Sequence, residues 1–316
     1  MMLSRRQFLR RTGGFAALMA TTIPSRPPES VPVMAALFGT SLGLSENLSP
    51  LGRAFNVTTV YAKPDANTRP VGRLLPDSLN PLLGVSPDGW YYQIKEGYVP
   101  RESLQPILPY QRPTHDPNHF KGFHETVAPF TAVRQYCAGH APIMGRVGYG
   151  AVLYVHDHLT DEKRQTWYAV SVGHTGAGLF GWVPALHMRR WVPPPPSLSA
   201  PALWIDNAHC KMSVYDGETL IGETAIYGPE LPRGVGHVKV NLPAAWASFP
   251  PAFIRSWILL YYPQGRKPLS MYGAFWHNRF GMPSQQASIE LPMHAARWLY
   301  NTLGSVSQAE IPVIVD

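Results

Sequence analysis

The chain of 316 residues is long enough for two or three domains, and a hydrophobic content of 45% is sufficient for packed cores. Its 33 prolines and 27 glycines predict many turns and exclude an architecture of long helices. Of the net charge of +7, residues 1–30 carry +4 through five arginines and one glutamate, so the +3 of the remainder gives no basis for nucleic-acid binding.

The two cysteines, Cys137 and Cys210, fall in segments that we assign to different domains. They either form a disulfide outside the cytoplasm or remain two buried thiols, as free cysteines commonly do. The twelve histidines are scattered, and His156 and His158 lack further ligands nearby, so we predict no metal site. The sequence shows no haem, iron–sulfur or dinucleotide motif, and we expect no cofactor.

Residues 1–30 are predicted to be an export signal. Paired arginines stand in the segment SRRQFLR (Ser4 to Arg10), and the apolar run from Gly13 to Ile23 follows it. That run is too short to span a bilayer, which takes about 20 residues, and is typical of a signal peptide. The pattern resembles a twin-arginine (Tat) signal, which implies a protein that is secreted or held in the cell envelope. Because no clear A-x-A cleavage site follows, an uncleaved basic anchor remains the alternative.

Residues 31–50 have no sustained hydrophobic period and are predicted to be a linker. Short strands alternate with turns in residues 51–108, and the expected strands are Val57–Ala62, Val71–Leu75, Trp90–Ile94 and Gly97–Pro100. Strands of this length at this spacing predict a small β-barrel, which we call the first module.

A second copy of the pattern occupies residues 126–192, the second module, after a predicted linker at 109–125. Three segments of the first module, Pro70–Arg73, Trp90-Tyr91 and Gly97–Pro100, are echoed by Pro142–Arg146, Trp167-Tyr168 and Gly181–Pro184. The repeated pattern resembles the bacterial SH3 (SH3b) domain, which implies two SH3-like barrels. The insert from His156 to Thr166 is predicted to be a solvated hairpin or loop.

The repeated aromatic residues allow two interpretations. Large aromatic side chains usually form barrel core. They could alternatively form a platform for a sugar or a peptide, and the residues concerned are Trp90, Tyr91, Trp167, Tyr168 and Trp182.

Residues 193–201 begin with four consecutive prolines and form the clearest boundary in the chain. Such a run favours an extended spacer of about 3.1 Å per residue. We therefore expect the modules on its two sides to be held apart.

Residues 202–316 form the predicted C-terminal domain. A hairpin is expected around Asp216-Gly217, a buried strand over Ile254–Tyr262, and a short helix over Met293–Leu303, where apolar residues recur at a helical period. Aromatic, histidine, asparagine and arginine side chains crowd into the segment that begins MYGAFWHNRF at Met271, a composition typical of a functional loop.

This segment resembles the catalytic domain of L,D-transpeptidases (YkuD-type). The resemblance rests on WHNRFGMP (Trp276 to Pro283), on SIEL (Ser288 to Leu291), on HAARWLY (His294 to Tyr300) and on the closing IPVIV. It implies a mainly β chain in which two small SH3-like barrels precede an L,D-transpeptidase-like β-sandwich domain with a short helix. It also implies that the natural partner is peptidoglycan or its wall peptides.

The residues that carry the family's chemistry are all replaced. The family uses a cysteine nucleophile and a histidine base; the resemblance places Ser288 at the cysteine and Tyr272 at the base histidine. The motif's serine, histidine and glycine fall on Gln285, Gln286 and Ala287. A serine hydroxyl ionises far less readily than a thiol, and a phenol with a pKa of about 10 is a poor base at neutral pH.

Two functions remain open at this point. In the first, the domain is catalytically inactive and binds peptidoglycan or its stem peptides, with Trp276, Arg279 and Gln286 as candidate binding residues. In the second, Ser288 acts as nucleophile and His277 as base in acyl transfer on wall peptides, which requires a Ser288–His277 hydrogen bond. His277 could equally be a structural hydrogen-bonding residue, and Arg279 could meet a substrate carboxylate or simply be exposed.

Overall fold

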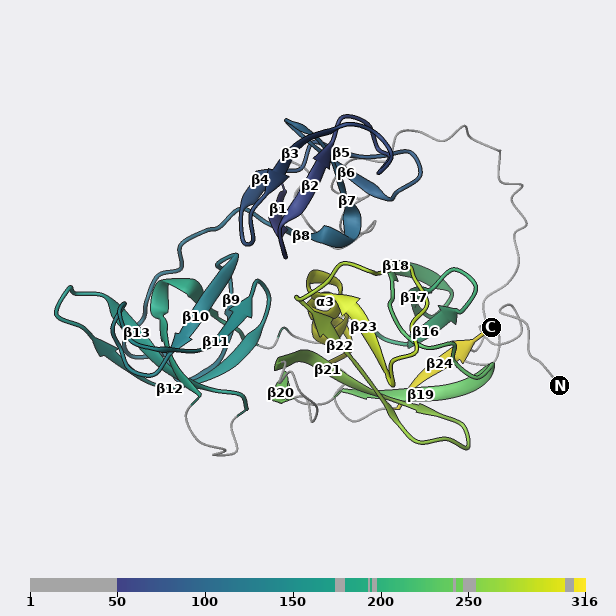
Figure 1. The fold of residues 1–316 in the computed structure, drawn as a ribbon. Helices are drawn as coiled ribbons and strands as arrows, with labels where there is room; N and C mark the ends of the chain where they lie inside the picture. The colour runs from purple at the N-terminus through teal and green to yellow at the C-terminus, as the bar shows by residue number, and fades with distance from the viewer. Residues whose placement is uncertain are drawn as a thin grey trace.

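The computed structural model describes residues 50–173, 180–192, 194, 198–240, 243–246, 254–304 and 310–316, and it shows a mainly β protein (Figure 1). The predicted signal at 1–30, the predicted linker up to residue 49 and three of the four prolines lie outside the described residues. Within the described part, no helix is long and apolar enough to cross a membrane.

The first module consists of two small antiparallel sheets around a core that includes Val60, Tyr92 and Leu104. The strand orders are β4-β1-β8 and β3-β2-β7-β6-β5. The elements are β1 (Leu51–Ala54), β2 (Thr58–Tyr61), β3 (Pro70–Leu74), β4 (Leu79–Pro81), β5 (Gly84–Val85), β6 (Tyr91–Ile94), β7 (Gly97–Pro100), the 3-10 helix η1 (Arg101–Ser103) and β8 (Leu104–Ile107).

The second module is one seven-stranded sheet in the order β11-β10-β14-β13-β12-β9-β15. Its elements are β9 (Gly122–Thr126), β10 (Phe130–Arg134), β11 (Ile143–Gly148), β12 (Val152–Thr160), β13 (Thr166–Ser171), β14 (Gly181–Pro184), the 3-10 helix η2 (Ala185–His187) and β15 (Met188–Arg190). The insert predicted at His156–Thr166 is the end of the β12–β13 hairpin, with its turn exposed to solvent.

The two modules repeat one pairing scheme. In both, a strand of the form Gly-aromatic-Val-Pro runs into a single 3-10 turn, and Gly97 and Gly181 have φ angles of +152° and +153°. A Cβ atom on Gly97 would lie 2.3 Å from the carbonyl oxygen of Tyr61, and one on Gly181 would lie 2.4 Å from that of Arg134. Both positions therefore require glycine, for the same reason in each copy.

The register corrects one detail of the predicted repeat. Tyr91 pairs with Pro100 in the first module as Trp167 pairs with Pro184 in the second, so Trp167 corresponds to Tyr91. Trp90, which the sequence aligns with Trp167, stands one residue before strand β6 and is 50% exposed. The two interpretations of the aromatics thus separate: Trp167 and Tyr168 are buried core, whereas Trp90 is on the surface.

We expect Gly97→Ala and Gly181→Ala each to lower the free energy of unfolding by about 2 kcal/mol or more. The added methyl group would clash with a backbone carbonyl oxygen, and alanine disfavours the positive φ angle of these positions. Gly139→Ala is the matched control, since Gly139 has no positive φ and no atom lies within 4 Å of the place that an added Cβ would take; its effect should stay within about 0.5 kcal/mol. Urea denaturation of the three variants measures the difference. If all three variants changed the free energy of unfolding equally, the close backbone contacts at Gly97 and Gly181 would not be what requires glycine there.

The C-terminal domain contains a nine-stranded mixed sheet with one helix against it. The strand order is β18-β17-β16-β24-β19-β21-β22-β23, with β20 beside β21. The elements are β16 (Pro201–Asp206), β17 (Lys211–Asp216), β18 (Thr219–Ala225), β19 (Gly234–Val240), β20 (Ala244–Trp246), β21 (Ile254–Pro263), β22 (Leu269–Ala274), β23 (Ser288–Pro292), α3 (Met293–Gly304) and β24 (Ile311–Val315). The predicted strand at Ile254–Tyr262 and the predicted helix at Met293–Leu303 are therefore present.

The prediction that the modules are held apart is wrong. Buried residues of the second module and of the C-terminal domain form one continuous hydrophobic cluster. The indole N–H of Trp257 donates to the carbonyl of Gly150 (3.1 Å), and the amide of Val152 donates to the hydroxyl of Ser256 (2.9 Å). A proline run specifies the local chain conformation but not where the attached domains dock, and here burial of apolar surface decides the arrangement.

An irregularity in β21 makes this docking possible. The pairing of β21 with β22 shifts register between Ser256 and Leu259, and Trp257 inside the shift has φ +59°. A bulge of this kind redirects a side chain out of the regular alternation. Trp257 consequently points to the second module and packs its ring against those of Trp191 (5.4 Å) and Tyr300 (5.5 Å).

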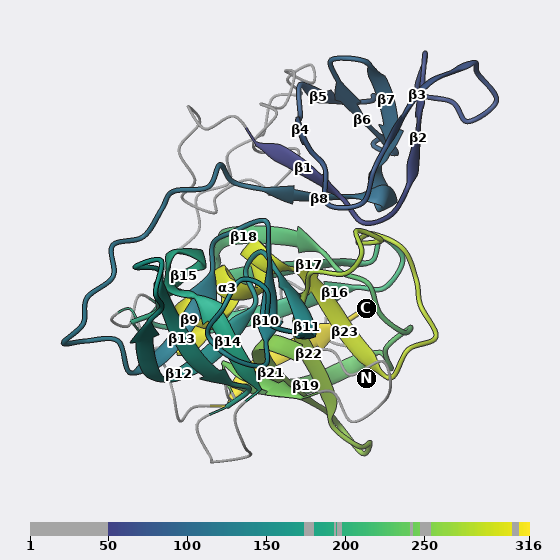
Figure 2. The same cartoon turned by 60° about the vertical axis from the view of Figure 1, so that its left-hand side comes forward.

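The first module also contacts the C-terminal domain. Its β1–β8 side faces that domain in both views (Figure 1, Figure 2). The buried side chain of Arg53 donates to the carbonyl of Phe275 (2.9 Å), and the amide of Asn278 donates to the hydroxyl of Tyr92 (2.8 Å). The aromatic segment singled out in the sequence, from Phe275 onward, is therefore the docking surface for this module.

Candidate functional site

Strands β22 and β23 bring the residues that match the catalytic positions together. The two strands are parallel, and Tyr272 lies opposite Glu290 in their register. Residues 288 and 290 are two apart and share one face of β23, while Ile289 and Leu291 point to the other face. The side chains of Tyr272, Ser288 and Glu290 thus meet on one side of the sheet, and all three residues are less than 10% exposed.

These side chains form a closed hydrogen-bonded network with His277. The phenol oxygen of Tyr272 lies 3.0 Å from the hydroxyl of Ser288 and 3.0 Å from one carboxylate oxygen of Glu290. The other carboxylate oxygen of Glu290 binds Nε2 of His277. We call these four residues the Tyr–Ser–Glu–His network.

The direction of the hydrogen bonds leaves Ser288 without a base. The carboxylate of Glu290 is an acceptor, so the single phenol proton of Tyr272 goes to it. The Ser288 hydroxyl then donates to the phenol oxygen of Tyr272. Burial and the neighbouring charge of Glu290 raise the pKa of Tyr272 to about 12, although Ser288 and Arg255 act in the opposite direction. A protonated phenol is a very weak acceptor for the serine proton at neutral pH.

Both nitrogens of His277 are occupied by groups other than Ser288. Nε2 is held by Glu290, and Nδ1 accepts the backbone N–H of Arg279 (3.0 Å). Because Nδ1 is an acceptor, this hydrogen-bond pattern corresponds to a neutral ring with its proton on Nε2. The rings of Tyr227 (4.9 Å) and Phe280 (5.0 Å) enclose the imidazole. The expected Ser288–His277 hydrogen bond is not among those of the described residues, and His277 has the geometry of a structural residue.

Glu290 is the central residue of the network, and it was not predicted from the sequence. It is 2% exposed, accepts hydrogen bonds from Tyr272 and His277, and pairs through its backbone with Tyr227 (2.9 and 2.7 Å). The signal available in the sequence was the position of Glu290, an acidic residue between the apolar Ile289 and Leu291 in the SIEL segment. A buried carboxylate needs hydrogen-bond donors, and the candidates in the sequence were the phenol of Tyr272 and the imidazole of His277, both already under consideration.

We expect the ionisation of Tyr272 to occur well outside the physiological range. Since its folded-state pKa is raised from 10 to about 12, the stability that the phenol proton contributes is fully present below pH 10 and is lost as the pH rises towards 12. A difference titration of phenolate absorbance between the wild type and Tyr272→Phe should therefore have its midpoint near pH 12. A midpoint below about 8 would make Tyr272 a competent base and contradict our assignment.

The three candidate binding residues are placed differently. Trp276 is half-buried, with its ring 6.1 Å from that of Tyr272, so it borders the network. Arg279 is exposed and pairs with Glu102 of the first module at 3.3 Å. Gln286 is exposed, and its backbone amide donates to the hydroxyl of Ser284 (3.1 Å). No hydrogen bond of the described residues joins the side chain of Arg279 or Gln286 to the network.

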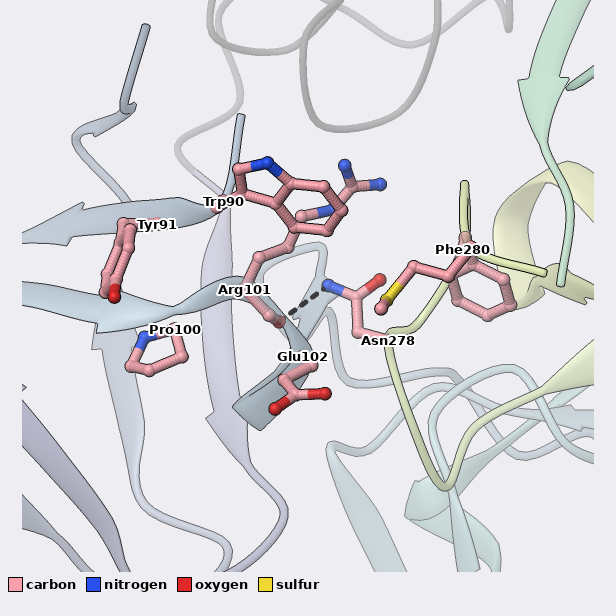
Figure 3. A pocket seen from close by; sticks show the side chains of 8 residues that line it. Trp90, Tyr91, Pro100, Arg101, Glu102, Asn278 and Phe280 are labelled. Atoms are coloured by element: carbon pink, nitrogen blue, oxygen red, sulfur yellow. Dashed lines mark hydrogen bonds between the residues drawn. The ribbon is translucent and has the colours of Figure 1, made fainter. Parts of the chain in front are cut away.

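A pocket of about 220 Å³ opens beside the network, between the first module and the segment that follows Trp276 (Figure 3). A second, smaller cavity of about 20 Å³ shares Arg101, Asn278 and Phe280 with it and reaches His277. The larger pocket is lined by Trp90, Tyr91, Pro100, Arg101, Glu102, Asn278, Phe280 and Met282. The sequence could not predict it, because its two walls lie nearly 180 residues apart and meet only through domain docking.

Neither cysteine lies in the Tyr–Ser–Glu–His network. Cys137 and Cys210 are both free thiols, so the disulfide alternative is wrong. Burial raises the pKa of the Cys210 thiol. Among the described residues, no group of three or more histidine, cysteine, aspartate or glutamate side chains could hold a metal ion. We assign no metal-binding or cofactor-binding role to any of them.

No protein-family model matches the chain, and no curated protein matches it significantly. The chain is similar to solved structures of L,D-transpeptidases. A cysteine-to-serine mutant of the Enterococcus faecium L,D-transpeptidase matches with a TM-score of 0.28 and 15% identity, over 38% of this chain and 50% of that protein. An L,D-transpeptidase from Mycobacterium tuberculosis H37Rv matches with a TM-score of 0.30 and 15% identity, over 59% and 92%. An L,D-transpeptidase in complex with imipenem matches with a TM-score of 0.31 and 11% identity, over 67% and 90%. This chain thus spans half the length of the Enterococcus protein, and likenesses this weak do not transfer activity or residues.

Proposed function

We propose that this chain is an exported protein of the cell envelope whose L,D-transpeptidase-like C-terminal domain is catalytically inactive and binds peptidoglycan or its stem peptides. The observation that supports inactivity is the closed Tyr–Ser–Glu–His network. Ser288 donates to a phenol that stays protonated at neutral pH, and both nitrogens of His277 are already used. A nucleophile without a base is not activated.

The proposal of a wall ligand rests on the sequence resemblance to L,D-transpeptidases and on the two repeated modules docked against the domain. The segment that follows Trp276 lies at the junction with the first module, next to a pocket with aromatic and charged walls. Pockets of this composition, formed where two domains meet, are frequent ligand sites. The SH3b character of the modules and the Tat-type export of the chain are part of the proposal.

An active acyl transferase that uses Ser288 is the second candidate, and one observation favours it. Ser288, Tyr272 and Glu290 stand in series, so the serine proton could pass to the phenol oxygen while the phenol proton passes to the carboxylate. The Ser288 oxygen would then form a bond to the acyl carbon as the leaving group departs. This route needs two coupled transfers through a group whose pKa is about 12, and we therefore rank it second.

Sedimentation of the full-length protein with purified peptidoglycan tests the proposed function. We expect the protein to pellet with intact sacculi and to remain in the supernatant with sacculi from which an amidase has removed the stem peptides. Equal pelleting with both preparations would indicate that the glycan is the ligand. No pelleting with either would contradict the proposed wall-binding role.

A further inference from the structure

We propose that the pocket between the first module and the segment after Trp276 binds the carboxylate end of a peptide. In this arrangement Arg101 receives the carboxylate, Trp90 packs against the terminal side chain, and Asn278 accepts a peptide N–H. This inference deepens the proposed function and rests on it for the source of the peptide, which would be the wall stem. The pocket is separate from the Tyr–Ser–Glu–His network, so binding here requires no catalysis.

The apolar side of the pocket includes a tryptophan that is half exposed to solvent. Trp90 is 50% exposed, whereas Trp167 in the second module is 1% exposed. In the register that matches Tyr91 with Trp167, Trp90 corresponds to Thr166, a polar residue, so the barrel core does not explain the aromatic ring. Its ring and those of Tyr91 and Phe280 line the pocket (Figure 3). Exposed aromatic rings at a cavity are typical of ligand-binding surfaces.

The charged side of the pocket contains Arg101, a cationic side chain without an anionic partner among the described residues. Glu102 pairs with Arg279, but Arg101 forms no ion pair among the described residues. Its Nε is buried and has no hydrogen-bond partner there. The guanidinium hydrogen-bonds the hydroxyl of Tyr92, a neutral partner; burial raises the pKa of this phenol, and Arg101 acts in the opposite direction. A single arginine without an anionic partner in a partly apolar pocket fits one carboxylate, which a planar guanidinium binds through two parallel hydrogen bonds.

Asn278 supplies the complementary acceptor. Its amide nitrogen donates to the hydroxyl of Tyr92 (2.8 Å) and to the carbonyl of Arg101 (3.1 Å), which fixes the orientation of the side chain. Its Oδ1 accepts no hydrogen bond from the described residues, and Figure 3 shows it turned away from the Arg101 carbonyl. A free acceptor near a guanidinium that has no carboxylate partner matches a peptide terminus, which offers an N–H and a carboxylate a few atoms apart.

The size of the pocket limits what can enter. Sites for drug-sized ligands occupy about 300–1,000 Å³, and this pocket of about 220 Å³ is smaller. It therefore accepts one or two residues at the end of a chain, with the rest of the peptide outside. A carboxylate within a long folded segment would not fit.

The test uses N-acetyl-alanyl-alanine and its C-terminal amide as probes, titrated into the full-length protein while the indole N–H signal of Trp90 is followed by NMR. We expect the acid to shift this signal and the amide to bind about 10- to 100-fold more weakly, because it lacks the charge for Arg101. Arg101→Gln should reduce the affinity for the acid to that for the amide. The two Trp90 variants lack this signal, so isothermal titration calorimetry measures their affinities: Trp90→Ala should weaken the binding of both probes, and Trp90→Phe should restore most of the loss.

Arg73→Gln is the matched control, since Arg73 is exposed in the same module, carries the same charge and does not line the pocket. It should bind the acid like the wild type. Equal binding of acid and amide, unchanged binding by Arg101→Gln, or no shift of the Trp90 signal would each overturn the inference. Thermal melting of each variant separates loss of binding from loss of folding, and Arg101→Lys, which keeps the charge, provides a second variant if Arg101→Gln does not fold.

Sedimentation with sacculi distinguishes this inference from the proposed function. If the wild type and Arg101→Gln pellet equally with sacculi and neither binds the dipeptide, the pocket inference fails and wall binding stands. If the dipeptide binds through Arg101 but sacculi do not pellet the protein, the pocket stands and the proposed wall partner fails.

Discussion

Replacing Glu290 with alanine is expected to lower the free energy of unfolding by about 2–5 kcal/mol. The substitution removes the acceptor of two buried donors, the hydroxyl of Tyr272 and Nε2–H of His277. Each buried donor left without a partner costs about 1–3 kcal/mol. The carboxylate is 2% exposed, so water cannot replace it without a change in packing. Chemical denaturation of the wild type and the variant measures the difference.

Two further variants make the prediction specific. Glu290→Gln keeps the volume and one acceptor oxygen for Tyr272 but turns an NH₂ group towards Nε2–H of His277. The imidazole cannot simply change tautomer, because Nδ1 faces the N–H of Arg279. We therefore expect an intermediate loss of about 1–3 kcal/mol. Glu218→Ala, at an exposed position, should change stability by less than about 0.5 kcal/mol. If Glu290→Ala behaved like Glu218→Ala, Glu290 would not hold the network.

Trp257→Ala is expected to destabilise the protein by about 3–5 kcal/mol, the usual range for removing a fully buried tryptophan. The substitution also removes the hydrogen bond to Gly150 and the ring contacts with Trp191 and Tyr300. Because the contacts with Gly150 and Trp191 join the second module to the C-terminal domain, the variant should unfold in two separate steps where the wild type unfolds these parts together. Differential scanning calorimetry shows the number of transitions.

Trp257→Phe is the matched control, since it keeps an aromatic ring and loses the N–H donor. It should cost about 1–2 kcal/mol and retain the joint transition of the wild type. If the second module and the C-terminal domain of the wild type already melt in separate transitions, the shared core is contradicted. It is also contradicted if Trp257→Ala still melts in one joint transition.

Local patterns predicted much of the fold. Alternating side chains and turn residues located the strands near β2, β3, β6 and β7, and a helical period located α3 over Met293–Gly304. The repeat predicted equivalent structure around Gly97 and Gly181, which share the same backbone conformation. These features depend on residues close together in sequence, and they are therefore visible in a single chain.

The domain arrangement depends on contacts between distant residues. Ile254–Pro263 has the composition of a regular buried strand, and nothing in it marks the bulge that turns Trp257 towards the second module. The contacts of Arg53 with Phe275 and of Asn278 with Tyr92 join residues 222 and 186 positions apart. The four prolines suggested that the second module and the C-terminal domain are separate. The composition of a linker does not reveal how much surface the domains on its two sides bury against each other.

The contact between Tyr272 and Ser288 could be predicted from the sequence, but the other hydrogen bonds around them could not. The family resemblance placed Tyr272 and Ser288 as partners, and their oxygens lie 3.0 Å apart. It could not predict that Glu290 takes the hydrogen bonds of both Tyr272 and His277, since this requires the parallel register of β22 and β23. The sequence named Trp90 as one of several candidate platform residues, but Arg101 stands in no motif that we recognised, so the pair was missed.

The most direct test of the central claim, that the network leaves Ser288 unactivated, is the intact mass of the full-length protein after exposure to a carbapenem. A cysteine-dependent L,D-transpeptidase treated in parallel shows that the reagent is active. We predict that the masses of the wild type and of Ser288→Ala both remain unchanged. A wild type that gains the mass of one carbapenem, with no gain in Ser288→Ala, would contradict the claim.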